Sequence, residues 1–286
     1  MWVVYAFAGA FFAGFTSILA KIGIKNIDSN LATAIRTVVI LCFSWLMVFL
    51  VGSQKTITEI DSKSLLFLVL SGCATGGSWL CYFKALQIGD VNKVIPIDKS
   101  STVLTMLLAF IFLGENFTLV KALCMLLIAC GTYMMIDLKP AAGKSVVGKS
   151  WLVFALLSAF FASLTAILAK IGIEGVESNL GTAIRTAVVL LLAWGIVLGQ
   201  GTQRQIKDIS KKSWLFLILS GFATGFSWLF FYRALQQGPA SVVVPIDKLS
   251  ILVSIAFAYF IFNERLNKKT ALGLLMIVIG TLSLLL

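Results

Sequence analysis

The sequence predicts an all-α integral membrane protein in which ten transmembrane helices form two inverted five-helix repeats around a central cavity. The first observation behind this prediction is composition. Of the 286 residues, 59% are apolar and 12% are charged, and the mean hydropathy is +1.01, which exceeds that of soluble domains. The second is an internal repeat. Residues 2–137 align with residues 151–286 at a constant offset of 149, and 63 of the 136 aligned pairs are identical. We therefore expect two domains, residues 1–143 and 144–286.

Each copy contains five apolar stretches, each near the roughly 20 residues that a helix needs to cross a bilayer. In the first copy they are Trp2–Ile24, Leu31–Val51, Ser64–Ile88, Val94–Leu113 and Thr118–Asp137. In the second they are Trp151–Ile173, Leu180–Gly199, Ser213–Gln237, Val243–Phe262 and Asn267–Leu286. Because five is odd, the second copy must cross the membrane in the opposite direction. Inverted repeats of this kind are typical of secondary transporters.

The basic residues of the connections are distributed unevenly. Three lie on the side of the N-terminus (Lys55, Lys63 and Lys121), and twelve lie on the other side. Since cytoplasmic loops are enriched in Lys and Arg, we expect both termini outside and the linker 139–149 in the cytoplasm, in the plasma membrane. The same bias explains the net charge of +11, so no nucleic-acid partner is implied.

Charged residues inside the spans require an explanation, because each costs at least about 2.5 kcal/mol at the bilayer centre. Both copies keep the same five: Lys21, Arg36, Lys84, Asp98 and Lys99, answered by Lys170, Arg185, Arg233, Asp247 and Lys248. Their positions near span ends predict one charged layer per copy, in opposite leaflets. Snorkelling of the bases to the headgroups explains any one of them. In the inverted copy, however, snorkelling would place the bases in the outer leaflet, against the positive-inside trend. We therefore also interpret each charged layer as a gate or as a set of groups that attracts an anionic substrate.

Asp98 and Asp247 each follow a proline by two residues. We interpret Pro96 and Pro245 as helix start signals in the first turn. The carboxylates are then members of structural or gating ion pairs, or else they bind a proton or a coupling ion. Glu115 and Glu264 end the fourth and ninth spans, where a polar end at the membrane interface is the simplest explanation.

The third and eighth spans read SGCATGGSWLCYFKAL and SGFATGFSWLFFYRAL. Their glycines, Gly72 and Gly76 with Gly221 and Gly225, are spaced for close helix packing. Their aromatic residues, Trp79, Tyr82, Trp228 and Tyr232, lie within about a turn of Lys84 or Arg233. These rings either line a substrate cavity beside a cation or belong to an interfacial belt or the core.

The stretch from Trp79 to Gly131, with its P-I-D-K-S-S and L-G-E-N elements, resembles the EamA repeat of the drug/metabolite transporter superfamily, and so does the second copy. Lys21, Arg36 and Gly114-Glu115 match positions of that repeat. The chain is similar to two fused single-repeat members. The resemblance implies a ten-helix basket with a central cavity, in a prokaryotic membrane, that moves small metabolites by alternating access.

We expect a secondary transporter or facilitator of a small polar metabolite. The charges favour anionic or zwitterionic substrates such as amino acids, and export is one of the two directions left open. The alternative is a lipid flippase or scramblase that binds anionic headgroups. We expect no enzyme, cofactor or metal, because histidine is absent, the five cysteines all lie in the first copy, and no phosphate-binding loop occurs. The partners expected are the substrate and membrane lipids. Because both repeats are in one chain, we expect a functional monomer.

Overall fold

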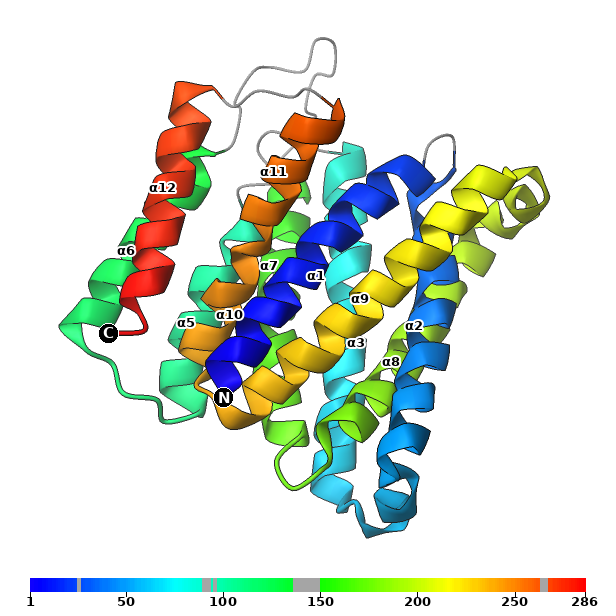
Figure 1. Cartoon of the computed structure of the whole chain (residues 1–286), viewed down its shortest axis with the longest axis horizontal. Coiled ribbons are helices and arrows are strands. Elements are labelled where there is room, and N and C mark those ends of the chain that lie inside the picture. The colour runs from blue at the N-terminus through cyan, green and yellow to red at the C-terminus, as the bar shows by residue number, and fades with distance from the viewer. Residues whose placement is uncertain (25–26, 89–93, 95–96, 136–149, 263–266) are drawn as a thin grey trace.

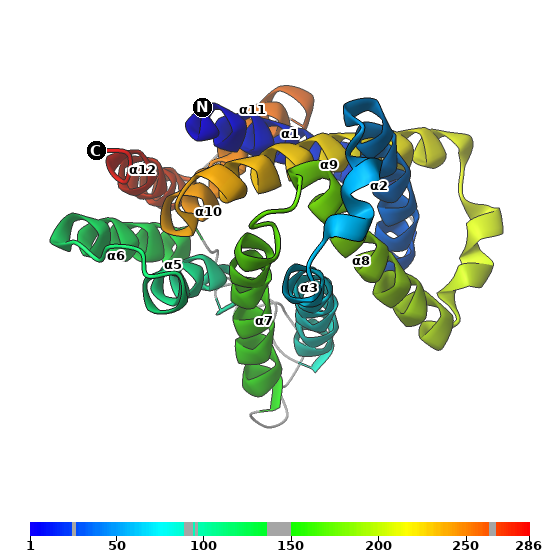
Figure 2. The same ribbon diagram turned by 90° about the horizontal axis from the view of Figure 1, so that it is seen from below.

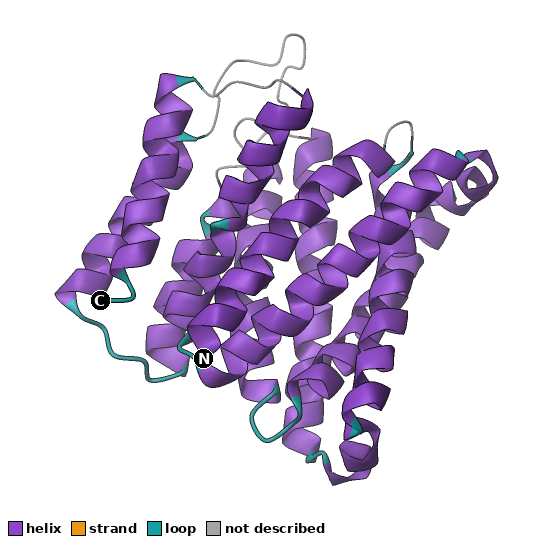
Figure 3. Cartoon of the chain, in the orientation of Figure 1, coloured by secondary structure: helices purple, strands orange, loops and turns teal. Residues whose placement is uncertain are grey.

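The chain is a bundle of helices in a computed structural model that describes residues 1–24, 27–88, 94, 97–135, 150–262 and 267–286. No strand occurs in these ranges, as Figure 3 shows. Seven helical segments are long and apolar enough to cross a membrane, and α6 is a shorter apolar helix. The protein is therefore a multi-pass membrane protein, as the composition predicts.

The two copies contain corresponding helices. The first copy contains α1 (Trp2–Gly23), α2 (Ser29–Val51), η1 (Ser53–Glu59), α3 (Ser62–Ile88), α5 (Ser101–Phe112) and α6 (Leu119–Met134). The second contains α7 (Ser150–Gly172), α8 (Ser178–Gln200), η2 (Thr202–Asp208), α9 (Lys211–Gln237), α10 (Ala240–Lys248), α11 (Ser250–Phe262) and α12 (Lys268–Ser283). The predicted spans agree with these helices within a few residues, with two exceptions. The ninth is divided into α10 and α11, and the fourth turns at Ser100, so that α5 begins seven residues after the predicted start at Val94. The predicted domain boundary lies within residues 136–149, outside the described residues.

Local signals repeat at the ends of the second helix in each copy. Asp28 accepts hydrogen bonds from the first amides of α2, and Glu177 does the same for α8. Both helices end at a glycine in the left-handed conformation, Gly52 with φ of 80° and Gly201 with φ of 70°, where a side chain would be strained. Such matching caps explain why the sequence repeat becomes a structural repeat.

Helices of one repeat pack mainly against helices of the other. The third helix of each copy lies along the first helix of the other, so that α9 packs on α1 and α3 on α7. The pairs α2 with α8 and α6 with α12 are also formed between repeats. Figures 1 and 2 show α6 and α12 as a pair at one edge, and α1 beside α9. The fold is therefore an interlocked pair of repeats.

The glycines of the third and eighth spans lie at two further contacts between the repeats, those of α3 with α8 and of α9 with α2. A Cβ added to Gly72 in α3 would lie 2.7 Å from Val188 of α8, and one added to Gly221 in α9 would lie 2.7 Å from Val39 of α2. Such distances leave no room for a side chain. The small residues thus allow α3 to approach α8, and α9 to approach α2.

The bundle has two distinct ends, and both termini lie at the same one (Figure 1). We call this end the terminus side and the opposite end, where α6 ends and α12 begins, the linker side. The basic starts of α9 (Lys211 and Lys212) and α12 (Lys268 and Lys269) lie on the linker side. These four bases lie on the side opposite the termini, where the sequence count places them.

Candidate functional site

A cavity of about 350 Å³ lies between the repeats. Its lining comes from both copies and includes Ser17 of α1, Lys99, Thr102 of α5, Thr132 of α6, and Asp247 and Lys248 of α10. Thr132 lies in the last turn of α6, so the cavity is on the linker side of the bundle. A hollow with two cations and one carboxylate in its wall can bind a polar molecule inside the membrane.

The cavity is formed at a break in the ninth span. Helix α10 ends at Lys248 and α11 begins at Ser250, with the Leu249 amide donating to the Ile246 carbonyl. Pro245 is inside α10, so the interpretation of this proline as a first-turn start signal is wrong. A proline inside a helix removes a backbone donor and disturbs the preceding turn, so Pro245 weakens α10 before its end at Lys248. Broken helices at membrane depth commonly carry transporter binding sites.

The corresponding Asp-Lys pair of the first repeat is anchored on the second. Asp98 Oδ1 accepts a hydrogen bond of 3.0 Å from the Ser158 hydroxyl of α7. Lys99 Nζ lies 3.9 Å from Asp98 Oδ2, and the side chain of Lys99 is 55% exposed. Since Lys99 lines the cavity, part of this accessible surface faces the cavity. Pro96, which precedes the pair, lies outside the described residues.

The expectation of two charged layers in opposite leaflets is wrong for these Asp-Lys pairs. Lys99 interacts electrostatically with Asp98, Asp247 and Lys248, and the last two belong to the other repeat. The physical reason is that α10 begins before its predicted start and breaks at its charged end. The charges of the two copies therefore meet at one site between the repeats.

Arg36 and Arg185 occupy equivalent places at the interface of the repeats. Arg36 Nη2 donates to Thr224 Oγ1 at 2.7 Å, and Arg185 Nη2 donates to Thr75 Oγ1 at 2.9 Å. In each case an arginine of the second helix of one copy reaches the middle of the third helix of the other. These bonds tie the repeats together, and the described lining of the cavity contains neither arginine.

The predicted aromatic residues have different surroundings in the two copies. Trp228 and Tyr232 lie under the guanidinium of Arg185, with ring centroids 5.4 and 4.4 Å from its central carbon. The cation on these rings is therefore Arg185, although Arg233 is nearer in sequence. Trp79 borders a separate small hollow beside α8. Tyr82 packs against a small cluster that includes Ala85 and Ala155.

Comparison with known proteins identifies the architecture. Two stretches, residues 1–137 and 149–286, match the EamA-like transporter family. The chain belongs to the EamA-like transporter family. A Sinorhizobium protein named "Uncharacterized transporter in cobO 3'region" is 44% identical over 138 residues, which are 98% of that protein and 48% of this chain. That relative therefore has about the length of one repeat.

Two further similarities concern longer proteins. The S-adenosylmethionine uptake transporter of Rickettsia conorii (strain Malish 7) is 28% identical over 198 residues, covering 69% of this chain and 64% of that protein. A solved crystal structure with 14% identity has a TM-score of 0.76 and covers 98% of this chain and 95% of its own. At that identity the similarity shows the fold alone. Together with the family match, these similarities describe a membrane transporter of small molecules.

Of the remaining predicted bases of this EamA-like transporter, Lys84 and Lys170 are not among the described residues that line the cavity. Lys170 binds the end of α9, and its Nζ donates to the carbonyls of Leu235 and Gly238 at 2.6 and 2.8 Å. Lys84 is exposed near the end of α3. Lys21 lies in the last turn of α1, and its side chain is outside the described part of the structure.

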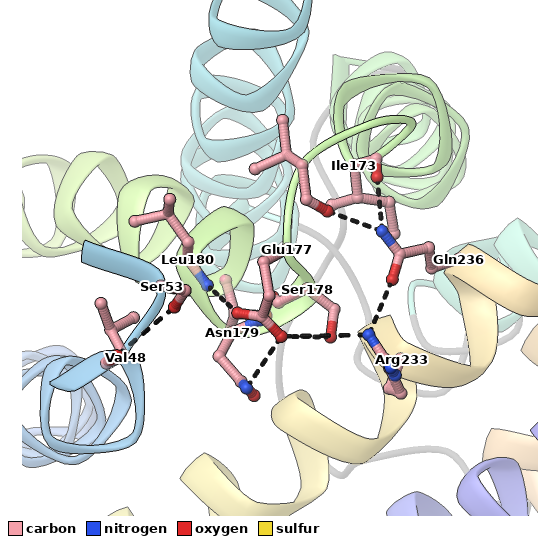
Figure 4. A network of polar contacts seen from close by, with 11 residues as sticks. Val48, Ser53, Ile173, Glu177, Ser178, Asn179, Leu180, Arg233 and Gln236 are labelled. Atoms are coloured by element: carbon pink, nitrogen blue, oxygen red, sulfur yellow. Dashed lines mark hydrogen bonds and ion pairs between the residues drawn. The ribbon is translucent and has the colours of Figure 1, made fainter. Parts of the chain in front are cut away.

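Arg233 belongs to a polar network on the terminus side (Figure 4). Its Nη1 donates to Gln236 Oε1 at 3.2 Å and lies 3.9 Å from Glu177 Oε1. Gln236 Nε2 in turn donates to the carbonyls of Ile173 and Val176. This network connects the end of α9 with the loop between α7 and α8. It borders a second hollow of about 280 Å³ that Tyr5, Phe226 and Phe230 also line.

A third hollow, of about 130 Å³, corresponds to the cavity in the other repeat. Its lining includes Ser101, Thr102 and Thr105, which are the counterparts of the cavity residues Ser250, Ile251 and Ser254 at the offset of 149. Both spaces touch Asp247 and Lys248. The two repeats therefore contain related hollows of unequal size that share the same charged residues.

Sequence reasoning missed the hydroxyl groups of the site. Ser17, Thr102 and Ser254 lie in apolar spans without any charge or motif that sets them apart, and hydroxyl groups are common in membrane helices. A usable signal was their distance from the Asp-Lys pairs, because Thr102 follows Lys99 by three residues and Ser254 follows Lys248 by six. The spacing of Thr102 corresponds to about one helical turn.

Proposed function

We propose that this EamA-like transporter moves a small zwitterionic or anionic metabolite, such as an amino acid, across the plasma membrane of a prokaryote by alternating access. The observation that carries the proposal is the meeting of Lys99, Asp247 and Lys248 at one cavity. Residues of both repeats build that cavity, so one chain supplies a complete site and functions as a monomer. A substrate gradient or a coupled ion drives transport.

The charges of the cavity favour a ligand with a carboxylate. Lys99 and Lys248 repel each other, and the repulsion is strong in the low dielectric of a membrane interior. A carboxylate between the two ammonium groups relieves it. Asp247 then remains available to hold an amino group, so the arrangement suits a zwitterion. S-adenosylmethionine, the substrate in the name of the Rickettsia relative, contains an amino acid group of this kind and is a candidate.

The size of the cavity favours a small metabolite over a phospholipid. A volume of about 350 Å³ is near the lower end of the range of ~300–1,000 Å³ for sites of small molecules. The unequal hollows in the two repeats support alternating access, because exchanging their conformations would enlarge the smaller one and close the larger. In this proposal Arg36 and Arg185 hold the repeats together, and Arg233 and Lys170 act in the closure of the terminus side.

The proposal is tested by uptake into liposomes that contain the purified protein. The panel contains a neutral amino acid, a dicarboxylate, S-adenosylmethionine, a sugar, an organic cation and a labelled lipid. We expect saturable uptake of a zwitterion or an anion. Lys248→Met should raise the KM for that substrate on the order of tenfold, because it removes a charged contact worth ~1.4 kcal/mol or more.

The matched control for this experiment is Lys212→Met, which removes an exposed lysine at the start of α9 and should leave uptake unchanged. Equal uptake of the sugar or the cation would contradict the charge argument. Movement of labelled lipid without any soluble substrate would favour the flippase alternative.

A further inference from the structure

The turn between α9 and α10 contains backbone groups that need partners from elsewhere. Pro239 precedes α10 as its N-cap and provides no side-chain hydrogen bond. The next two residues, Ala240 and Ser241, are completely buried. Amides in the first turn of a helix have no partner within that helix, and leaving them unpaired inside a protein costs ~1–3 kcal/mol each.

Glu115 of the other repeat supplies these partners. It lies in the connection between α5 and α6, and its Oε1 accepts from the Ala240 amide at 2.5 Å. Its Oε2 accepts from the Ser241 amide at 3.0 Å and also from the Ser241 hydroxyl. Glu115 is therefore more than a polar helix end at the membrane interface. This carboxylate caps a helix of the opposite repeat.

Lys170 holds the same turn from the other direction. Its Nζ donates to three carbonyls at the end of α9, those of Leu235, Gln236 and Gly238. A cation at a helix C-terminus and an anion at a helix N-terminus both match the helix dipoles. Lys170 and Glu115 also interact electrostatically with each other. The turn is thus clamped between opposite charges.

The clamped turn lies on the terminus side and leads to the cavity. A Cβ added to Gly238 would lie 2.6 Å from Trp2, at the start of α1, and Figure 1 shows α9 passing into α10 near the N-terminus. From here α10 extends for nine residues, or roughly 13 Å, to Asp247 and Lys248 at its other end. A shift of its capped end therefore displaces the charges in the cavity wall.

We propose that Glu115 is a positioning residue of the transport cycle. Its carboxylate holds α10 in place while the terminus side is closed, and it releases the helix when that side opens. The connection between α5 and α6 in the first repeat is thereby coupled to the charged end of α10 in the second. This inference rests on the proposed alternating access, but its test requires no substrate.

The test measures from which side a cavity residue can be reached. Ser17→Cys, at an exposed position that lines the cavity, is introduced into a chain whose five cysteines are replaced by alanine. A membrane-impermeant thiol reagent is added to one side at a time. With Glu115 present, Cys at this position should react from the linker side only. Glu115→Gln should increase the rate from the terminus side on the order of tenfold, because a charge-assisted bond no longer holds the closed form.

The matched control is Asp61→Asn, which removes a carboxylate that caps α3 within its own repeat by accepting from the Ser64 amide at 3.1 Å. It should not change the rate from the terminus side. Ser241→Ala removes only one donor to Glu115 and should increase that rate by a smaller factor, which covers the case that Glu115→Gln does not fold. Unchanged rates in the Glu115→Gln or Ser241→Ala chains, or an equal increase in the control, would overturn the proposal. A protein that labels as expected but transports nothing would refute the proposed function alone.

Discussion

Arg185 is the largest side chain that is fully buried in the described structure, with 1% of its surface exposed. Its Nε donates to Ser71 at 3.3 Å and its Nη2 to Thr75 at 2.9 Å. Tyr232 and Trp228 cover its faces. Hydroxyl groups and aromatic faces together offset part of the cost of removing a guanidinium from water. An arginine so surrounded holds three helices, α3, α8 and α9, in one arrangement.

Replacing Arg185 tests this role. Arg185→Lys keeps the charge but loses the planar group that bonds and stacks at the same time. We expect the free energy of unfolding to fall by ~2 kcal/mol, measured as a lower apparent Tm in detergent.

Arg204→Lys, at an exposed position in η2, is the control and should leave the Tm unchanged. A stable Arg185→Lys protein would show that the hydroxyl and ring contacts contribute little.

At the scale of the element, α6 and α12 depend on glycine. They form a pair at the edge of the fold, where a Cβ on Gly131 would lie 2.5 Å from the Gly273 carbonyl oxygen and one on Gly273 would lie 2.6 Å from that of Gly131. Because the obstructing atoms belong to the backbone, the helices cannot adjust by moving a side chain. Close van der Waals contact is the main attraction between helices in lipid, so this pair needs small residues here.

A single methyl group should therefore separate α6 from α12. We expect Gly131→Ala to destabilise the protein by ~1–3 kcal/mol, as measured by scanning fluorimetry.

Gly195→Ala is the matched control, because its Cβ would meet nothing within 4 Å in α8. It should raise stability by ~0.5–1 kcal/mol through better helix propensity. Equal effects of the two substitutions would mean that the contact between α6 and α12 is not tight.

The ninth span shows where prediction of elements fails. Its apolar residues and its length predict one helix, and both properties are satisfied by α10 and α11 together. The structure instead begins a helix at Ala240, where Glu115, 125 residues away in sequence, accepts from the first amides, and it interrupts the span at Leu249. A cap supplied by the other repeat leaves no mark in the local sequence.

At the scale of the whole molecule, the inverted repeat and the loop charges make one prediction about orientation. The basic starts of α9 and α12 lie on the linker side, opposite both termini. Because basic connections stay in the cytoplasm, both termini should lie outside.

We expect alkaline phosphatase fused after Leu286 to be active and a fluorescent protein at the same place to be dark. The reverse should hold for fusions within residues 139–149. Activity of the terminal phosphatase only in the cytoplasm would reverse the proposed orientation. The clamp on the terminus side would then close the cytoplasmic side of the protein.

The sequence by itself determined the membrane class, the positions of the helices outside the fourth and ninth spans, the two repeats and the small residues at which helices approach. These are local properties, because hydropathy, span length and helix caps act over a few residues. Only the tertiary structure decided that Lys99 shares a cavity with Asp247 and Lys248, that Arg185 stacks on Tyr232, and that Glu115 caps α10. Each of these contacts joins residues that are far apart in sequence. Their distances depend on how interlocked and broken helices cross, which no short stretch of the chain specifies.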